Sequence, residues 1–274
     1  MAIASMKSMP AKTLLAKCMP AIFVGHGNPM NVIRRNQWTQ RWKDLGQAIP
    51  RPRAILAVSA HWYLPAIRVT AMTNPRTIHD FGGFPKELFE IKYRAPGAPA
   101  LAEKVRDMLA PLPVELDHDW GFDHGTWSVL YHIFPMADIP VVQLSIDRTK
   151  PPSFHYEIGQ LLTPLRDEGI LIMGSGNIVH NLQAYEWERP EIGAFEWASR
   201  FEEKIRNLLQ SGKNGQLVNY SAIGHEARLA VPTPDHYLPF LYVLGTRRKG
   251  DLITFPIEGF DGGSMSMLTI QISP

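Results

Sequence analysis

Short apolar runs alternate with longer amphipathic stretches from residue 21 onward. Runs rich in aliphatic and β-branched residues predict strands at residues 21–24, 53–59, 67–71, 140–146, 170–174, 252–256 and 267–272. Helical periodicity predicts helices at residues 99–109, 126–134, 153–167, 191–210 and 235–244. Strands that alternate with helices are typical of an α/β domain. We therefore expect three layers, with a central mostly parallel or mixed sheet and helices on both faces.

The chain shows no linker that would divide it into two halves. No stretch rich in Pro and Gly separates two composition classes, so we expect one domain over residues 20–274. Residues 1–19 are expected to form a leader, because the apolar run among their lysines is too short for a secretory signal. The single cysteine, Cys18, excludes an internal disulfide and favours a reducing, cytoplasmic location.

Charge and hydropathy argue against two classes of partner. The 28 basic and 26 acidic residues are spread along the chain, so we expect no nucleic-acid partner. The longest apolar runs have the length of strands and are far shorter than a membrane span, so we expect no membrane association. A monomer or a small homo-oligomer is the expected state.

Histidines follow three of the predicted strands, and this placement is the strongest pointer to function. The histidines are His26, His61 and His180. In open α/β sheets, ligands bind outside the carboxyl ends of the strands. If these strands are parallel and adjacent, the three imidazoles converge on one edge of the sheet. One such histidine is more often structural, but three in the same placement favour a site.

Two more histidines stand at the starts of predicted helices. Gly125 follows His124 and allows a close backbone approach. Asp235 precedes His236 and is expected to cap that helix. Imidazole is the commonest side-chain metal ligand. Because there is no CxxC pair or HExxH helix, any metal site must be assembled from distant segments, and the spacing alone leaves its ligands open.

The segment at residues 73–99 differs from the rest of the chain. It is rich in Pro, Gly and aromatic residues and has little periodicity. A long irregular segment inside a compact domain is often a functional loop or lid. A surface excursion with its own small cluster fits the same pattern.

Six stretches together carry a resemblance to a known family. They are FVGHGNPM (23–30), SAHWY (59–63), IHDFGGFPKELFEIKYRAPG (78–97), GFDHGTWSVL (121–130), MGSGNIVHNL (173–182) and VPTPDHYLPFLYVLG (231–245). With these, the chain resembles the 4,5-DOPA extradiol dioxygenase family of the class III, LigB-type ring-cleaving dioxygenases. The resemblance runs from about residue 20 to the C-terminus and is specific, since every stretch is several residues long and all occur in order.

The resemblance implies a role for each of the five histidines. It implies one divalent metal bound by His26, His61 and His236, with His180 as the acid–base residue and His124 beside the O2 site. Fe(II) is expected for dioxygenase activity. Three histidines with an open position are equally typical of zinc, so Zn(II) is expected to fit the same site.

The implied reaction is the cleavage of a DOPA-like catechol ring by O2 to a muconic semialdehyde. The partners are then a small aromatic diol and O2. A lid over the metal edge would shield the reaction, so we expect Trp62, Phe81, Phe84 and Tyr93 to gather at the pocket and contact the aromatic ring.

Two other functions remain open at this point. A zinc hydrolase could use the same three histidines to activate water, and its activity would not depend on O2. A non-catalytic member of the family could bind a metal or a small aromatic molecule, and loss of His180 would then have no effect.

Overall fold

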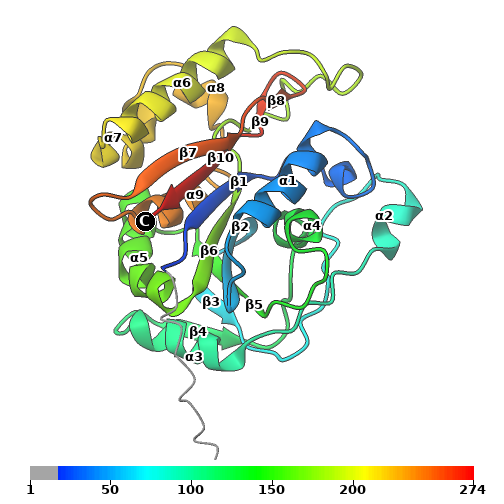
Figure 1. Ribbon diagram of the computed structural model, residues 1–274. Helices are drawn as coiled ribbons and strands as arrows, with labels where there is room; N and C mark the ends of the chain where they lie inside the picture. The colour runs from blue at the N-terminus through cyan, green and yellow to red at the C-terminus, as the bar shows by residue number, and fades with distance from the viewer. Residues whose placement is uncertain (1–17) are drawn as a thin grey trace, which may run out of the picture.

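An eight-stranded sheet with the order β4-β3-β5-β2-β6-β1-β10-β7 forms the centre of the fold. The computed structural model describes residues 18–274, so residues 1–17 of the predicted leader lie outside the described part (Figure 1). The strands are β1 Ala21–Gly25, β2 Ala54–Leu64, β3 Ile67–Thr70, β4 Val114–Asp117, β5 Val141–Asp147, β6 Ile170–Gly176, β7 Leu252–Ile257 and β10 Thr269–Ser273.

The middle of the sheet is parallel and its borders are mixed. Strands β5, β2, β6 and β1 pair in parallel, whereas β10 is antiparallel to β1 and β3 is antiparallel to β5. A separate two-stranded sheet is formed by β8 Phe260–Asp261 and β9 Met265–Ser266. The expected α/β fold with a mostly parallel central sheet is confirmed.

Helices cover both faces of the sheet (Figure 1). They are α1 Gln37–Ala48, α2 Lys86–Glu90, α3 Pro99–Met108, α4 His124–Ile133, α5 Pro152–Leu162, α6 Glu196–Gln210, α7 Asn214–Val218, α8 Ala227–Ala230 and α9 Leu238–Gly245, with 3-10 helices η1 Pro29–Val32, η2 Thr163–Glu168 and η3 Tyr220–Ala222. Within the described residues, no helix has both the length and the apolar character needed to cross a bilayer.

Alternate side chains of the central strands pack into two separate hydrophobic cores. In β2, Ile55 and Ala57 pack with α1 and α4, whereas Leu56 and Val58 pack with α3, α5, α6 and α9. Successive residues of a strand point to opposite faces, so a strand that is buried on both sides must be apolar throughout. The near-continuous apolar runs of β1, β2 and β6 therefore follow from their position between two helical layers.

Three predicted helices differ from the observed ones by more than two residues at one end. The predicted helix at 153–167 divides into α5 and η2, because Pro164 has no amide hydrogen to continue the α-helical ladder. The predicted helix at 191–210 begins only at Glu196. The helix expected from Asp235 begins at Leu238 instead. Helix α1 and strand β4 were not predicted.

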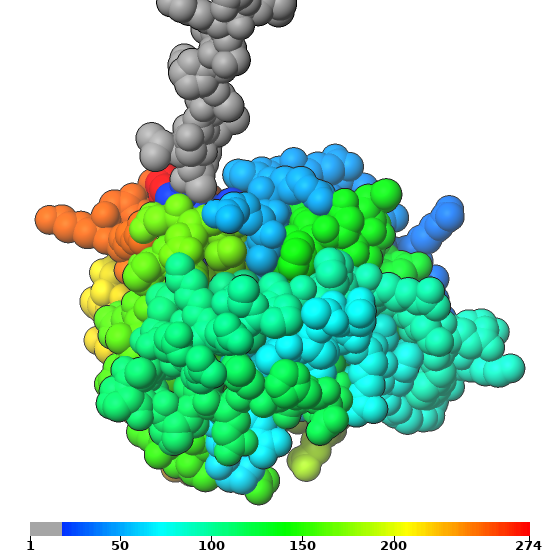
Figure 2. Space-filling model, turned by 90° about the horizontal axis from the view of Figure 1, so that it is seen from below, coloured from blue at the N-terminus to red at the C-terminus, as the bar shows by residue number. Residues whose placement is uncertain are grey.

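The segment between β3 and α3 crosses the surface of the molecule. Figure 2 shows it in cyan to teal, extending across this face to the projecting α2. It is tied down at Phe122, which exchanges backbone hydrogen bonds with Arg76 and Ile78. The irregular segment expected at residues 73–99 thus contains one short helix and is anchored close to the start of α4.

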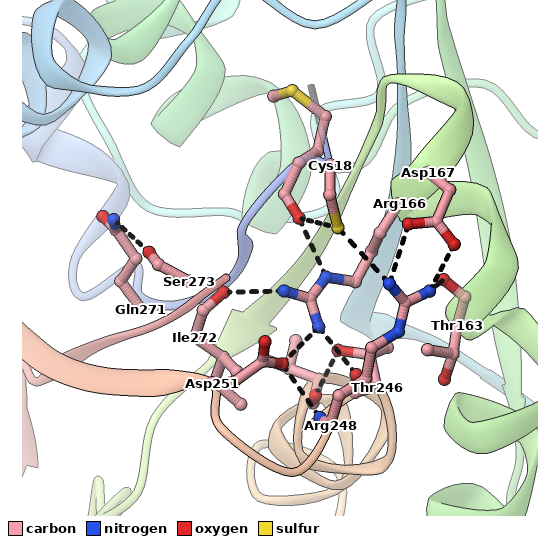
Figure 3. Close-up of polar contacts among 12 residues, drawn as sticks. Cys18, Thr163, Arg166, Asp167, Thr246, Arg248, Asp251, Gln271, Ile272 and Ser273 are labelled. Atoms are coloured by element: carbon pink, nitrogen blue, oxygen red, sulfur yellow. Dashed lines mark hydrogen bonds and ion pairs between the residues drawn. The ribbon is translucent and has the colours of Figure 1, made fainter. Parts of the chain in front are cut away.

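A fully buried arginine ties distant segments together beside the amino ends of β1 and β6. Arg166 is 0% exposed and lies in η2. Its guanidinium donates to the carbonyl oxygens of Met19, Thr246 and Ile272 and, at 2.6 Å, to the carboxylate of Asp251 (Figure 3). The start of β1, the end of α9 and strand β10 are held together by this one side chain.

We expect Arg166→Met to lower the free energy of unfolding by about 3–5 kcal/mol, because it leaves the Asp251 carboxylate buried without its partner. Urea denaturation followed by circular dichroism measures this change. Arg51→Met is the control, since Arg51 and Asp138 form an exposed pair at 2.8 Å whose loss should cost less than about 1 kcal/mol. Equally small losses of unfolding free energy in both variants would contradict the structural role assigned to Arg166.

Candidate metal centre

Three histidines from separate segments meet at the carboxyl edge of the parallel strands. His26 follows β1, His61 belongs to β2, and His236 lies just before α9. Their ring centroids are 5.0, 5.3 and 5.2 Å apart, so the three rings form a nearly equilateral triangle. One ring nitrogen from each lies within 4.8 Å of the others, and the Nε2 atoms of His26 and His61 are 3.2 Å apart.

The sheet order explains this convergence. Strand β6 lies between β2 and β1, and all three run in parallel, so their carboxyl ends share one edge. His61 was predicted to follow its strand, but β2 continues to Leu64. The pairing of β2 with β6 ends at Ser59, and its register with β5 shifts between Val58 and Tyr63. His61 therefore lies beyond the regular part of the strand.

Hydrogen bonds to Nδ1 fix the tautomer of His26. Its Nδ1 lies 3.0 Å from the Ser175 hydroxyl oxygen. That hydroxyl donates its only hydrogen to the Gly125 carbonyl oxygen at 2.5 Å, so it must accept from His26. With the proton on Nδ1, the Nε2 lone pair of His26 faces the centre of the triangle.

Carboxylates impose the same tautomer on the other two histidines. The Asp235 carboxylate lies 2.5 Å from Nδ1 of His236, and the Asp80 carboxylate lies 3.4 Å from Nδ1 of His61. An ionised carboxylate only accepts hydrogen bonds, so each Nδ1 carries a proton. The expectation that Asp235 caps a helix is wrong, because the cap position of α9 is Tyr237 and Asp235 orients His236 instead.

The electrostatics of the triangle favour a bound cation. Burial lowers the pKa values of His26 and His61 well below the ordinary value, and charge on neighbouring histidines would lower them further. Both imidazoles are therefore neutral, and two Nε2 lone pairs face each other at 3.2 Å. A divalent metal removes this repulsion, and three imidazoles with carboxylate or hydroxyl partners on Nδ1 are typical of metal sites. The residues present fit the metal that the resemblance implies.

Close packing at two glycines brings the ligand segments together. A Cβ atom at Gly125 would lie 2.5 Å from the Ser59 hydroxyl oxygen and 2.9 Å from Cδ2 of His61, which confirms the close approach expected there. A Cβ atom at Gly176 would lie 2.1 Å from the His236 carbonyl oxygen. Gly176 belongs to β6, so this close approach lies at the carboxyl end of that strand.

His180 and His124 lie beside the triangle without belonging to it. The His180 ring stacks on His236, with centroids 3.5 Å apart and planes inclined by 4°. The His124 ring centroid is 3.8 Å from that of His61, and its Nδ1 is 3.0 Å from the Asp80 carboxylate. Burial, followed by the neighbouring His236, lowers the pKa of His180 well below its ordinary value. All five histidines singled out in the sequence are thus neighbours.

Asp80 stands between two imidazoles. His61, Asp80 and His124 form a second group whose ligand atoms lie within 4.8 Å of one another. The Asp80 carboxylate faces Nδ1 of both histidines and also accepts the His124 backbone N–H at 2.9 Å. Burial would raise the pKa of Asp80, but its contacts with His124 lower it. The Asp80 carboxylate is therefore a shared polar neighbour of the two rings.

The histidines lie at the floor of a cavity of about 580 Å³, a size typical of small-molecule sites. His26, His124 and His236 are buried, whereas Leu182 and Trp187 are 47% and 59% exposed at its mouth. The residues that line it are His26, Gly27, Asn28, Pro29, Met30, Arg34, His61, Gly82, Gly83, Phe84, Pro85, His124, His180, Leu182, Tyr185, Trp187, Pro190, His236 and Met265.

The aromatic residues expected at this pocket fall into two pairs. Phe84 lines the cavity, and Phe81 contacts both Phe84 and His124 with centroids 5.4 Å apart in each case. The placement of Trp62 at the pocket is wrong. Trp62 is 2% exposed and stacks on Trp120, because consecutive residues of β2 point to opposite faces and His61 takes the face of the cavity.

Tyr93 is also placed elsewhere than expected. It is 2% exposed, and its hydroxyl donates to the Phe134 carbonyl oxygen at 2.9 Å. Its ring belongs to the core beneath α4, where it holds the segment after α2 against the domain. The mixture of aromatic residues in this segment thus serves both the pocket and the local packing.

Several residues of the site were not singled out in the sequence. Asp80 and Ser175 lie against Nδ1 of His61 and His26, and the cavity is lined by Arg34, Leu182, Tyr185 and Trp187. Asp80 is adjacent to His79 in the irregular segment, and Ser175 lies between two glycines. Neither position carries a periodic signal, so only the folded chain relates them to the histidines.

Comparison with known proteins identifies the family. Residues 21–254 match the family model described as the catalytic LigB subunit of aromatic ring-opening dioxygenase. The chain belongs to the LigB family. This assignment confirms the resemblance carried by the six sequence stretches.

Relatives within the LigB family cover nearly the whole chain. The 4,5-DOPA dioxygenase extradiol of Escherichia coli (strain K12) is 52% identical, over 93% of this chain and 94% of the relative. The 4,5-DOPA dioxygenase extradiol of Beta vulgaris is 35% identical, over 89% of this chain and 92% of the relative. A crystal structure of an uncharacterized protein from Escherichia coli K12 is 47% identical, with a TM-score of 0.82, and covers 93% of this chain and 100% of that one.

We expect Asp235→Asn to weaken metal binding by about 10- to 100-fold, because the amide is a poorer acceptor for the His236 Nδ1 proton. Competition with a chelator measures the affinity. Asp117→Asn is the matched control, since Asp117 accepts backbone N–H groups of a turn that contributes no ligand. A stability loss in the metal-free Asp235→Asn protein with unchanged affinity would restore the helix-cap interpretation.

Proposed function

We propose that this chain is a metal-dependent extradiol dioxygenase that opens the ring of a DOPA-like catechol with O2. Both oxygen atoms enter the product, and a carbon–carbon bond beside the diol breaks, which gives a muconic semialdehyde. The observation that carries the proposal is the set of three imidazoles at the cavity floor with His180 beside them but outside the set. The LigB family and the names of the relatives support it.

One divalent metal would be held by His26, His61 and His236. When bound, it supplies the Lewis acidity that favours an ionised catechol and the electron exchange with O2 that the reaction requires. We assign Fe(II) to the active enzyme, and the same three imidazole donors fit Zn(II). The three protein ligands come from one side, so the cavity side stays open for the diol and O2.

His180 is the residue placed to move the catechol proton. Its backbone N–H donates to the Ala230 carbonyl oxygen at 2.8 Å, and it forms an isolated bridge with Met265. The ring is held against His236 by stacking, and its side chain makes no hydrogen bond with any described residue. It can therefore accept a proton from a substrate hydroxyl and return it later in the reaction.

His124 is assigned an electrostatic role. Its ring lines the cavity, and its Nδ1 lies 3.0 Å from the Asp80 carboxylate. We assign to His124 a hydrogen bond to the negative charge that develops on oxygen. Phe84 lines the same cavity and offers an apolar surface to the aromatic ring of the substrate.

Anaerobic loading with Fe(II) and addition of a panel of catechols tests the proposed function. We expect O2 uptake that depends on the catechol and a yellow semialdehyde product, and neither with the Zn(II)-loaded protein. A zinc hydrolase would instead be active with Zn(II) and indifferent to O2. A non-catalytic member would bind the metal or the catechol and consume no O2. Either result would contradict the proposal.

We expect His180→Gln to retain the metal and to lose about 10²- to 10⁴-fold in turnover, because glutamine cannot transfer the proton. Metal content and catechol binding to the Zn(II)-loaded protein are measured beside steady-state rates. His155→Gln is a control, since His155 is buried and bonds to Tyr242, and neither residue lines the cavity. If His180→Gln lost the metal, His180 would have to be assigned as a ligand. If the variant kept full activity, the acid–base assignment would be wrong.

A further inference from the structure

The mouth of the cavity carries one permanent positive charge. Among the lining residues, Arg34 is the only lysine, arginine, aspartate or glutamate. It is exposed, like Leu182 and Trp187, whereas the histidines of the floor are mostly buried. A catechol that binds through its two oxygens at the floor must direct its ring substituent toward this mouth.

The guanidinium of Arg34 has no partner among the described residues. No ion pair or side-chain hydrogen bond joins it to any residue in the range 18–274. Arg34 also lines a neighbouring groove with Asp261, whose carboxylate accepts the Tyr185 hydroxyl at 3.0 Å and forms no ion pair with Arg34. Five N–H donors of a planar fork therefore stay available at the cavity mouth, in the geometry that suits a carboxylate.

The backbone that carries Arg34 is well fixed relative to the metal site. Arg34 follows η1, and its backbone N–H donates to the Met30 carbonyl oxygen at 3.0 Å. The Asn28 side chain caps η1, and the segment begins directly after the ligand His26. Asn31, at the end of this turn, is buried and accepts from Asn36 at 2.7 Å. The same short segment thus supplies a ligand at the floor and a cation at the mouth.

We propose that Arg34 determines specificity by binding a carboxylate on the side chain of the catechol. The substrate class is then catechols with an anionic side chain, and an amino group on that side chain is not required. This inference rests on the proposed ring-opening function. A charged pair at a partly solvated mouth acts mainly on binding, and it cannot take part in the proton transfers at the floor.

The test compares 3-(3,4-dihydroxyphenyl)propionate with 4-methylcatechol in the Fe(II)-loaded protein. We expect Arg34→Gln to lower the ratio of their kcat/KM values by about tenfold, through KM of the anionic catechol. Arg35→Gln is the matched control, because Arg35 is the adjacent exposed arginine and does not line this cavity. The ratio should be unchanged in Arg35→Gln, and the wild-type preference should weaken at high salt.

Equilibrium binding of both catechols to the Zn(II)-loaded protein under argon separates the two proposals. If the wild type opens neither ring, the proposed function fails, and the binding ratio still tests Arg34. An unchanged ratio in Arg34→Gln would overturn the assignment. An equal fall in both variants would also overturn it, since the effect would then belong to the general charge of the segment.

Discussion

His26 and His61 bring their Nε2 atoms to 3.2 Å from each other, and this contact governs the rest of the site. A proton shared between the two Nε2 atoms would relieve their repulsion, but it would place a positive charge on the rings. Burial disfavours charge on either ring, because it lowers the pKa values of both. Ser175 and Asp80 occupy the Nδ1 side of these rings, so both lone pairs point inward. His236, whose Nδ1 contacts the Asp235 carboxylate, adds a third lone pair. Under the proposed function, a divalent cation would use these three facing lone pairs as ligand atoms.

The order of the central strands makes this arrangement possible. Parallel β2, β6 and β1 deliver His61, Ser175 and His26 to one edge, and α9 crosses β6 closely enough to present His236. That crossing requires Gly176, since any larger residue would meet the His236 backbone. The start of α4 approaches from the other face, where Gly125 both receives the Ser175 hydrogen bond and makes room for His61. The three histidines are thus positioned by secondary structure on both sides of the sheet.

The sequence predicted the parts of this fold that depend on local patterns. Apolar runs located the central strands, because a strand between two helical layers must be apolar on both sides. Helix α1 was missed although Trp38, Trp42 and Leu45 follow a helical spacing and Asn36 and Thr39 form a capping box, because its other residues are polar. The short strand β4 has too few residues for a periodic signal.

The candidate site likewise contains residues that the sequence predicted and residues that it did not. The five histidines were found from their positions beside predicted elements and from the family motifs, and the structure brings them together. Their partners Asp80, Ser175 and Asp235 were missed or misinterpreted, because a hydrogen bond to Nδ1 depends on contacts between distant segments. Trp62 and Tyr93 were misplaced for a related reason. Which face a strand residue takes, and whether an aromatic side chain of a loop turns inward, depends on packing partners that the local sequence does not specify.

A crystal structure of the metal-loaded protein with anomalous scattering at the metal edge tests the central claim most directly. The account predicts one metal ion, bonded to Nε2 of His26, His61 and His236 at about 2.0–2.2 Å. His180 and the Asp80 carboxylate should lie outside bonding distance, with Asp80 still facing Nδ1 of His61. A metal bonded instead to the Asp80 carboxylate and His124, or to His180 in place of His236, would contradict it.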